Sequence, residues 1–244
     1  MTWPLSAAAT AQLGSPRTSS QTVLRLSMRE LVLSGTWLLE RTAPPRRWEG
    51  RADGLRLLPG DAPVPDPPPL ATLDRALRGG CPYGGPARAV MALAVKQHPG
   101  LADALRAEGF AELTGRGLLV TERRLLRTHR KLTPTGHAWA ASPAQERARW
   151  RTELAAGRPV LSAVVAAPGV VLTGGQDLLL LLDAEVRRLR GRGELTVEFS
   201  SLDLEDGLSG LGGLQDMGGL DSAVDSGSGG GGDGGGDGGG GGGD

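Results

Sequence analysis

The sequence has one cysteine, few aromatic residues and almost no lysine. Cys81 stands alone, which excludes an internal disulfide bond and any metal site built from several thiolates, and fits a reducing compartment. Aromatic residues make up 3% of the 244 residues, so base stacking on an aromatic platform is not indicated. Lysine occurs only as Lys96 and Lys131, so arginine, the better bidentate ligand for phosphate, carries nearly all positive charge.

The patterns of common catalytic and metal sites are missing too. His98, His129 and His137 do not stand at metal-ligand spacing from one another or from a carboxylate. The chain contains no serine nucleophile elbow and no phosphate-binding loop of the Walker type. We therefore expect a protein that is not an enzyme, with no catalytic residue, no cofactor and no metal.

Long apolar runs are also missing. The longest one, residues 159–172, is interrupted by Pro168 and Gly169 and is shorter than the roughly 20 residues that a membrane-spanning helix requires. The first residues lack the basic start and apolar centre of a signal peptide. The sequence therefore predicts a cytoplasmic protein that is soluble or attached to a membrane surface.

Composition divides the chain into three parts. Residues 1–22 are rich in Ala, Ser, Thr and Gln without periodicity, and residues 201–244 consist mainly of Gly, Asp and Ser. Such segments bury too little apolar surface to offset chain entropy, so we expect a disordered N-terminal segment and a disordered acidic tail. Residues 23–200 remain as one compact domain with a sizeable core.

The net charge of zero conceals two opposite blocks. Between residues 116 and 151 the only acidic residues are Glu122 and Glu146, whereas every charged residue from Asp203 onward is acidic. The basic residues of the first block are Arg116, Arg123, Arg124, Arg127, Arg130, Lys131, Arg147, Arg149 and Arg151. This segregation predicts either a basic patch for an anionic partner with the tail as its competitor, or a solvated basic face with a solubilising tail.

Local patterns in the first half predict a helix and a hairpin. Ser27 and Glu30 form a capping box, which predicts a helix that begins there and ends at the prolines that start with Pro44. A short hairpin is expected over residues 46–58, around a tight turn at Asp53 and Gly54.

The rest of the chain is expected to be mainly helical. Residues 59–69 predict an exposed, proline-fixed connector. Ser142 and Pro143 are typical of an N-cap and the first position of a helix. Helices are expected at residues 70–77, 88–95, 101–113, 142–156, 160–167 and 178–189, with the leucine run 178–182 buried, and a last strand at 194–199. The predicted fold is therefore mainly α, a compact single helical domain with a β-hairpin and disordered termini.

Residues 101–139 are the most informative segment, because they predict a helix, a glycine break and a basic hairpin. Leu125 and Leu126 could enter the acyl boundary of a membrane, while Arg124, Arg127, Arg130 and Lys131 meet anionic headgroups. A helix followed by a basic β-wing also suits a winged-helix protein on DNA. A hairpin that mediates self-association, or that only packs on the core, is a further reading.

Three blocks in the same order resemble the Golgi phosphoprotein 3 (GPP34) family. Residues 29–40 are similar to the family helix IELALRGRLQLE, with agreement at Glu30, Leu31 and Gly35. Residues 61–77 resemble the family pattern DAPTGDxLLDEAL with extra prolines. Residues 106–122 resemble RERLxxxLVxxGVLxxE, and the likeness as a whole covers roughly residues 23–183.

This resemblance implies a mostly helical domain with a hydrophobic hairpin, and binding to phosphatidylinositol 4-phosphate on the cytosolic face of a membrane. Arg106 falls on the first arginine of the RERL pattern and Glu108 on the second. The arginine before the family's first matched helix falls on Leu24, with Arg25 beside it. The expected headgroup-binding residues are therefore Arg25, Arg106, Arg124, Arg127, Arg130 and Lys131, and the expected membrane-inserting residues are Leu125 and Leu126.

Overall fold

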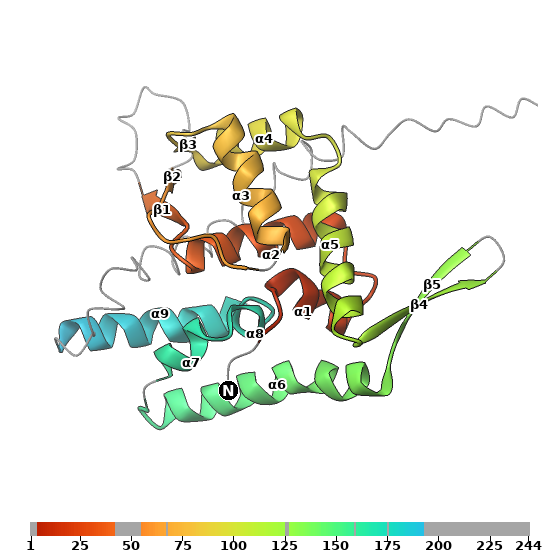
Figure 1. The fold of residues 1–244 in the computed structure, drawn as a ribbon. Coiled ribbons are helices and arrows are strands. Elements are labelled where there is room, and N and C mark those ends of the chain that lie inside the picture. Colours follow the sequence, from red (N-terminus) through yellow and green to blue (C-terminus); the bar gives the residue numbers. More distant parts are fainter. Residues whose placement is uncertain are drawn as a thin grey trace, which may run out of the picture.

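The computed structural model describes residues 4–41, 55–66, 68–124, 127–158, 160–174 and 176–192. Within these residues the helices are α1 (Ala7–Gly14), α2 (Ser20–Leu33), α3 (Pro68–Gly80), α4 (Ala87–Gln97), α5 (Leu101–Gly115), α6 (Pro134–Ala155), α7 (Leu161–Val165), α8 (Pro168–Leu172) and α9 (Gln176–Gly191) (Figure 1). The strands are β1 (Trp37–Arg41), β2 (Leu55–Pro59), β3 (Gly85–Pro86), β4 (Leu119–Arg124) and β5 (Arg127–Leu132). The predicted mainly helical class with a β-hairpin is confirmed.

Helix α1 corrects the prediction of a disordered segment over residues 1–22. The hydroxyl of Ser6 caps α1 by accepting a hydrogen bond from the backbone N–H of Ala9 at 3.1 Å. Ala7, Ala8 and Ala9 are fully buried, and α1 packs against α2, α5, α6 and α8. A helix enclosed on all sides shows no amphipathic period, so the segment gave no helical signal although alanine is the strongest helix former. The predicted tail and the strand at 194–199 lie outside the described residues.

Glycines let the neighbouring helices come close to α1. A Cβ atom on Gly169 of α8 would stand 2.8 Å from the backbone oxygen of Leu5 and 3.1 Å from that of Ser6. We therefore expect Gly169→Ala to lower the free energy of unfolding by roughly 1–3 kcal/mol, because backbone atoms must shift to admit the methyl group. Gly115→Ala is the matched control, since a Cβ at that position of α5 has nothing within 4 Å. Urea denaturation of both variants measures the difference, and equal stability would contradict this account of α1 packing.

The bounds of α2 differ from those that the capping box predicted. The hydroxyl of Ser19 accepts from the backbone N–H of Thr22 at 3.2 Å, so the helix begins before Ser27, which lies buried inside it. The helix ends at Leu33, and Gly35 then takes a left-handed conformation with φ of 75°. The expected continuation to Pro44 is wrong, because the following residues form a strand. Pairing in a sheet outweighed the local preference for helix there.

Strands β1, β2 and β3 form a small antiparallel sheet in that order. Leu39 pairs with Leu57 and Arg41 with Leu55. The end of the hairpin expected over residues 46–58 corresponds to β2, which pairs with β1, and the expected first strand from residue 46 lies outside the described residues. The turn at Asp53 and Gly54 lies outside the described residues.

A triad of side chains joins this sheet to α3, with Trp37 and Asp74 buried and Arg78 half-exposed. The indole N–H of Trp37 donates to Asp74 Oδ1 at 2.8 Å, and Arg78 Nε donates to the same carboxylate at 2.8 and 3.0 Å. Trp37 is fully buried, so its N–H has no access to water. The guanidinium of Arg78 also lies 5.6 Å from the centre of the Trp37 ring. Asp74 therefore ties β1 to α3 through the Trp37 N–H and also accepts from Arg78 of its own helix.

We expect Asp74→Ala to lower the free energy of unfolding by about 2–4 kcal/mol, because the Trp37 N–H and the Arg78 guanidinium both lose their acceptor. Asp66→Ala is the control, since Asp66 is exposed. Tryptophan fluorescence during urea unfolding reports the change directly. A variant as stable as the control would show that the triad contributes nothing.

The C-terminal helices differ in detail from expectation. Helix α6 begins after Thr133, whose hydroxyl accepts from the Gly136 N–H at 3.0 Å, and it continues through Pro143. The expected start at Ser142 is therefore wrong. The helix expected at 160–167 corresponds to α7, and the short helix α8, which follows it, was not predicted. In α9 the predicted burial of the whole leucine run is wrong for Leu180 and Leu181, which are 60% and 45% exposed. Within the described residues α9 packs mainly against α6 and α8, and part of its leucine run faces outward.

Within the described residues, none of the helices combines the length and apolar character needed to cross a bilayer.

Candidate functional site

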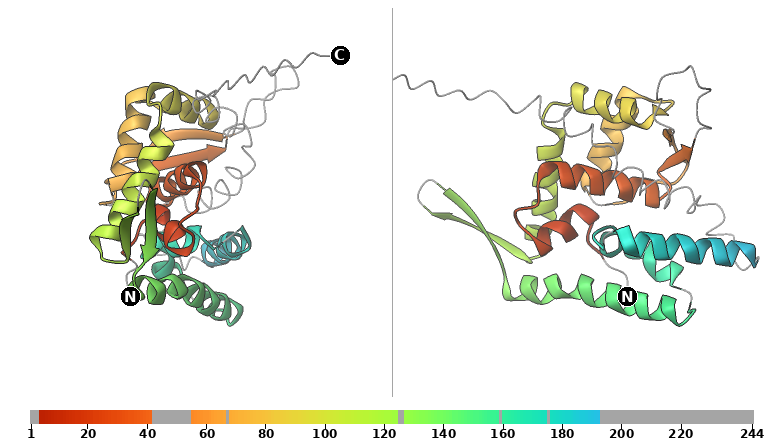
Figure 2. Two further views of the ribbon diagram at one scale, coloured as in Figure 1. Left: turned by 90° about the vertical axis from the view of Figure 1, so that its right-hand side faces the viewer. Right: turned by 180° about the vertical axis from the view of Figure 1, so that it is seen from behind.

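The β4–β5 hairpin extends away from the helical body as a two-stranded arm between α5 and α6 (Figures 1 and 2). Gly117, with φ of 68°, makes the break that the sequence predicted between helix and hairpin. The base of the arm is anchored because Leu119 pairs with Leu132 and both pack in a cluster with Phe110, Leu113 and other residues. The register brings Arg124 opposite Arg127 at the last described pair.

Arg130 and Lys131 are neighbours on β5 and therefore lie on opposite faces of the arm. The guanidinium of Arg130 stands 4.0 Å from the centre of the Phe110 ring on α5. Lys131 Nζ lies 4.0 Å from Glu122 Oε1 on the other face, where both side chains are well exposed. The two predicted headgroup ligands thus do not present one common surface.

Arg106 joins Arg130 on the face of the arm that meets α5. Its guanidinium lies 5.5 Å from the centre of the same Phe110 ring, one turn before Phe110 on the helix. Arg106 Nε is buried and has no hydrogen-bond partner within the described chain. We call Arg106, Phe110 and Arg130 the hairpin-base cluster. It brings together two arginines that the sequence singled out from separate elements.

The other predicted residues fall in different places. Arg25 is half-buried on α2, where its charge acts on Arg29 of the same helix. Glu108, at the family's second arginine, accepts a hydrogen bond from the Thr72 hydroxyl of α3 at 2.7 Å. Leu125, Leu126 and the side chains of Arg124 and Arg127 lie outside the part that the structure describes.

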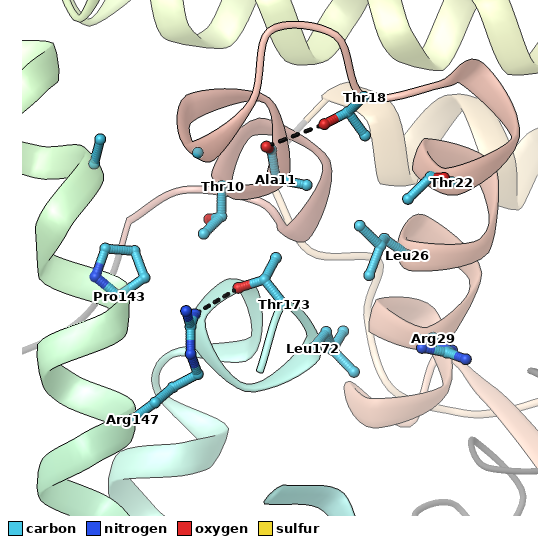
Figure 3. Close-up of a pocket in the computed structure, with 12 residues that line it drawn as sticks. Thr10, Ala11, Thr18, Thr22, Leu26, Arg29, Pro143, Arg147, Leu172 and Thr173 are labelled. Carbon is cyan, nitrogen blue, oxygen red and sulfur yellow. Dashed lines mark hydrogen bonds between the residues drawn. The ribbon is translucent and has the colours of Figure 1, made fainter. Parts of the chain in front are cut away.

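A pocket of about 410 Å³, which the sequence did not predict, opens between α1, α2, α6 and α8 (Figure 3). Arg29 reaches it from α2 and Arg147 from α6, on opposite sides. The hydroxyl residues of its wall are Thr10, Thr18, Thr22 and Thr173. Among the described residues, no aspartate or glutamate lines it.

Arg29 is 6% exposed, and its Nε has no hydrogen-bond acceptor among the described residues. Burial lowers the pKa of Arg29 from its ordinary value, and the nearby charge of Arg25 lowers it further. A buried guanidinium without a carboxylate is costly. The buried positive charge of Arg29 therefore lacks a negatively charged partner among the described residues.

Arg147 is held in place by the end of α8. Its Nη1 donates to Thr173 Oγ1 at 3.0 Å and more weakly to the Val170 carbonyl at 3.4 Å. Burial lowers the pKa of Arg147, and the charge of Arg151 adds to that effect. The guanidinium is thus fixed at the wall of the pocket.

The carboxyl of Glu30, next to Arg29 in the chain, does not serve these arginines. It accepts a hydrogen bond from the backbone N–H of Ala7 at 2.7 Å, at the start of α1. Burial is the main cause that raises its pKa to about 8, and the charge of Glu112 contributes. Glu30 is therefore mostly uncharged at neutral pH. The neighbouring carboxylate of Glu112 accepts hydrogen bonds from the backbone N–H and the hydroxyl of Ser6 at 3.1 and 2.6 Å.

Among the described residues, histidine, cysteine and carboxylate side chains form no group of three that could hold a metal ion. Comparison of the chain with protein-family models, with curated proteins and with solved structures gave no match.

Proposed function

We propose that this chain is a non-enzymatic, peripheral membrane protein that binds anionic phospholipid headgroups through the β4–β5 arm and the hairpin-base cluster. One observation carries the proposal: the arm that stands out from the body is the most basic part of the chain, and Arg106 joins it at its base. Each basic residue near an anionic surface contributes on the order of 1 kcal/mol to binding.

The arrangement of the arm suits a surface more than a closed pocket for one headgroup. Arg130 and Lys131 occupy opposite faces, so an arm that lies along a membrane meets lipid phosphates with one face while the other remains in water. Leu125 and Leu126, at the end of the arm in sequence, supply the apolar residues that would enter the acyl boundary. The likeness to the GPP34 family adds phosphatidylinositol 4-phosphate on a cytosolic membrane face as the lipid of first choice.

A duplex nucleic acid competes for the same charges, so the test compares the two polymers. The full chain is incubated with phosphatidylserine vesicles and, separately, with labelled duplex DNA at equal, low ionic strength. The proposal predicts that the protein sediments together with the vesicles. It also predicts that the fluorescence anisotropy of the labelled DNA does not change as protein is added. Tight DNA binding that falls steeply with salt, without vesicle binding, would replace the membrane proposal by the winged-helix one.

A further inference from the structure

We propose that the pocket between α1, α2, α6 and α8 binds a small dianionic molecule, such as a phosphate monoester or a short dicarboxylate, between Arg29 and Arg147. This site is separate from the hairpin-base cluster, because it is built on other helices and contains none of the residues of the arm. The inference therefore stands or falls independently of membrane binding.

Arg29 brings an uncompensated positive charge to the pocket. The side chain is buried to more than nine tenths and lines the pocket, and none of the carboxylates that the structure describes lines the pocket with it. Removal of a guanidinium from water without a partner costs several kcal/mol, and an anion in the pocket supplies that partner. The guanidinium of Arg29 is thus positioned to bind an anionic ligand and forms no ion pair within the described chain.

Arg147 is oriented at the pocket wall by Thr173. The Thr173 hydroxyl donates to the Gly169 carbonyl at 2.8 Å, so its lone pair is left to accept from Arg147 Nη1. Arg147 Nε and Nη2 make no hydrogen bond within the described part of the chain. A fixed guanidinium with two remaining donor nitrogens suits two oxygens of a phosphate or carboxylate group.

The pocket has the size and the lining of a small-molecule site. A volume of about 410 Å³ falls within the range of sites for small molecules, roughly 300–1,000 Å³. The walls combine threonine hydroxyls with apolar side chains such as Leu26 and Leu172. Because the two arginines lie on opposite sides (Figure 3), a molecule with two negative charges balances both. A short carbon skeleton that carries phosphate or carboxylate groups fits this lining.

The test uses thermal unfolding of the full chain with four probes at equal ionic strength: chloride, inorganic phosphate, glycerol 3-phosphate and succinate. The proposal predicts a saturable rise of Tm with glycerol 3-phosphate or succinate over chloride, with calorimetry to give the Kd of each. A stronger response to glycerol 3-phosphate assigns the site to phosphate esters, and a stronger response to succinate assigns it to dicarboxylates. Equal Tm in all four solutions would overturn the proposal, and a response to inorganic phosphate alone reduces it to an adventitious ion only.

Three variants locate the effect. Arg147→Gln should weaken binding of the responding probe by roughly 10- to 100-fold, because one charged hydrogen-bond donor is lost. Arg149→Gln is the control, since Arg149 lies on the same helix but pairs with Glu146 and Glu153 at the surface. Arg29→Met should abolish binding and raise the Tm of the ligand-free protein, because an apolar side chain of similar length replaces an unpaired buried charge. If Arg29→Met lowers the ligand-free Tm and keeps the response, Arg29 is structural and the proposal fails.

Discussion

Replacement of Arg124 and Arg127 by alanine should weaken binding to anionic vesicles by roughly 30-fold at low salt. The two residues form the last described pair of the arm. Each contributes about 1 kcal/mol near an anionic surface, so their loss removes about 2 kcal/mol of binding free energy. Vesicle sedimentation over a range of lipid concentrations measures the change. The difference should shrink as salt rises, because added ions screen the attraction.

The matched control for this variant is Arg75→Ala/Lys96→Ala. It removes two positive charges from exposed positions on α3 and α4, which lie at the top of the body and are not part of the arm (Figure 1). If both double variants lose affinity equally, net charge and not the arm governs binding. Leu125→Ser/Leu126→Ser keeps the charges of the arm, so a loss of binding in that variant would report insertion of apolar side chains.

Glu30 should make the free energy of unfolding fall as pH rises from about 4.5 to about 8. The folded state keeps a proton on this buried carboxyl up to about pH 8, whereas the unfolded chain releases it near the ordinary value of 4.5. The contribution is fully present below pH 4.5 and lost above pH 8. This difference in pKa between the folded and the unfolded state corresponds to at most about 5 kcal/mol of folding free energy, because one pKa unit is equivalent to about 1.4 kcal/mol. The hydrogen bond from Ala7 opposes the shift but does not cancel the effect of burial.

Glu30→Gln isolates this contribution. The amide keeps an oxygen that can accept from the Ala7 N–H but has no proton to release. We expect the variant to show a flatter stability profile between pH 5 and pH 9 and to be more stable than the parent protein above pH 8. Glu153→Gln, at the surface of α6, should leave the profile unchanged. Identical stability profiles for the parent protein and the Glu30 variant would refute the raised pKa of the buried Glu30 carboxyl.

The sequence predicted the elements whose signals are local. The helices near residues 70–77, 88–95 and 101–113 were predicted, the last of them from its amphipathic spacing, and Gly117 marks the start of the hairpin. The hairpin-base cluster was predicted in part, because Arg106 and Arg130 were singled out. Phe110 was not, since an aromatic residue on an amphipathic helix usually belongs to the core.

The missed features depend on contacts between distant segments. Helix α1 shows no period because neighbours enclose it, and Ser27 and Glu30 look like a cap although both are buried within α2. The pocket was missed for the same reason. Arg29 and Arg147 come from helices far apart in the chain, and no local pattern indicates that α8 brings them to one cavity.

Flotation of the full chain with phosphatidylcholine vesicles, with and without phosphatidylinositol 4-phosphate, tests the central claim most directly. At low salt the account predicts that the protein floats with the vesicles that contain the anionic lipid and stays at the bottom with neutral vesicles. Protein that remains at the bottom of the gradient in both cases, and also with phosphatidylserine, would contradict it.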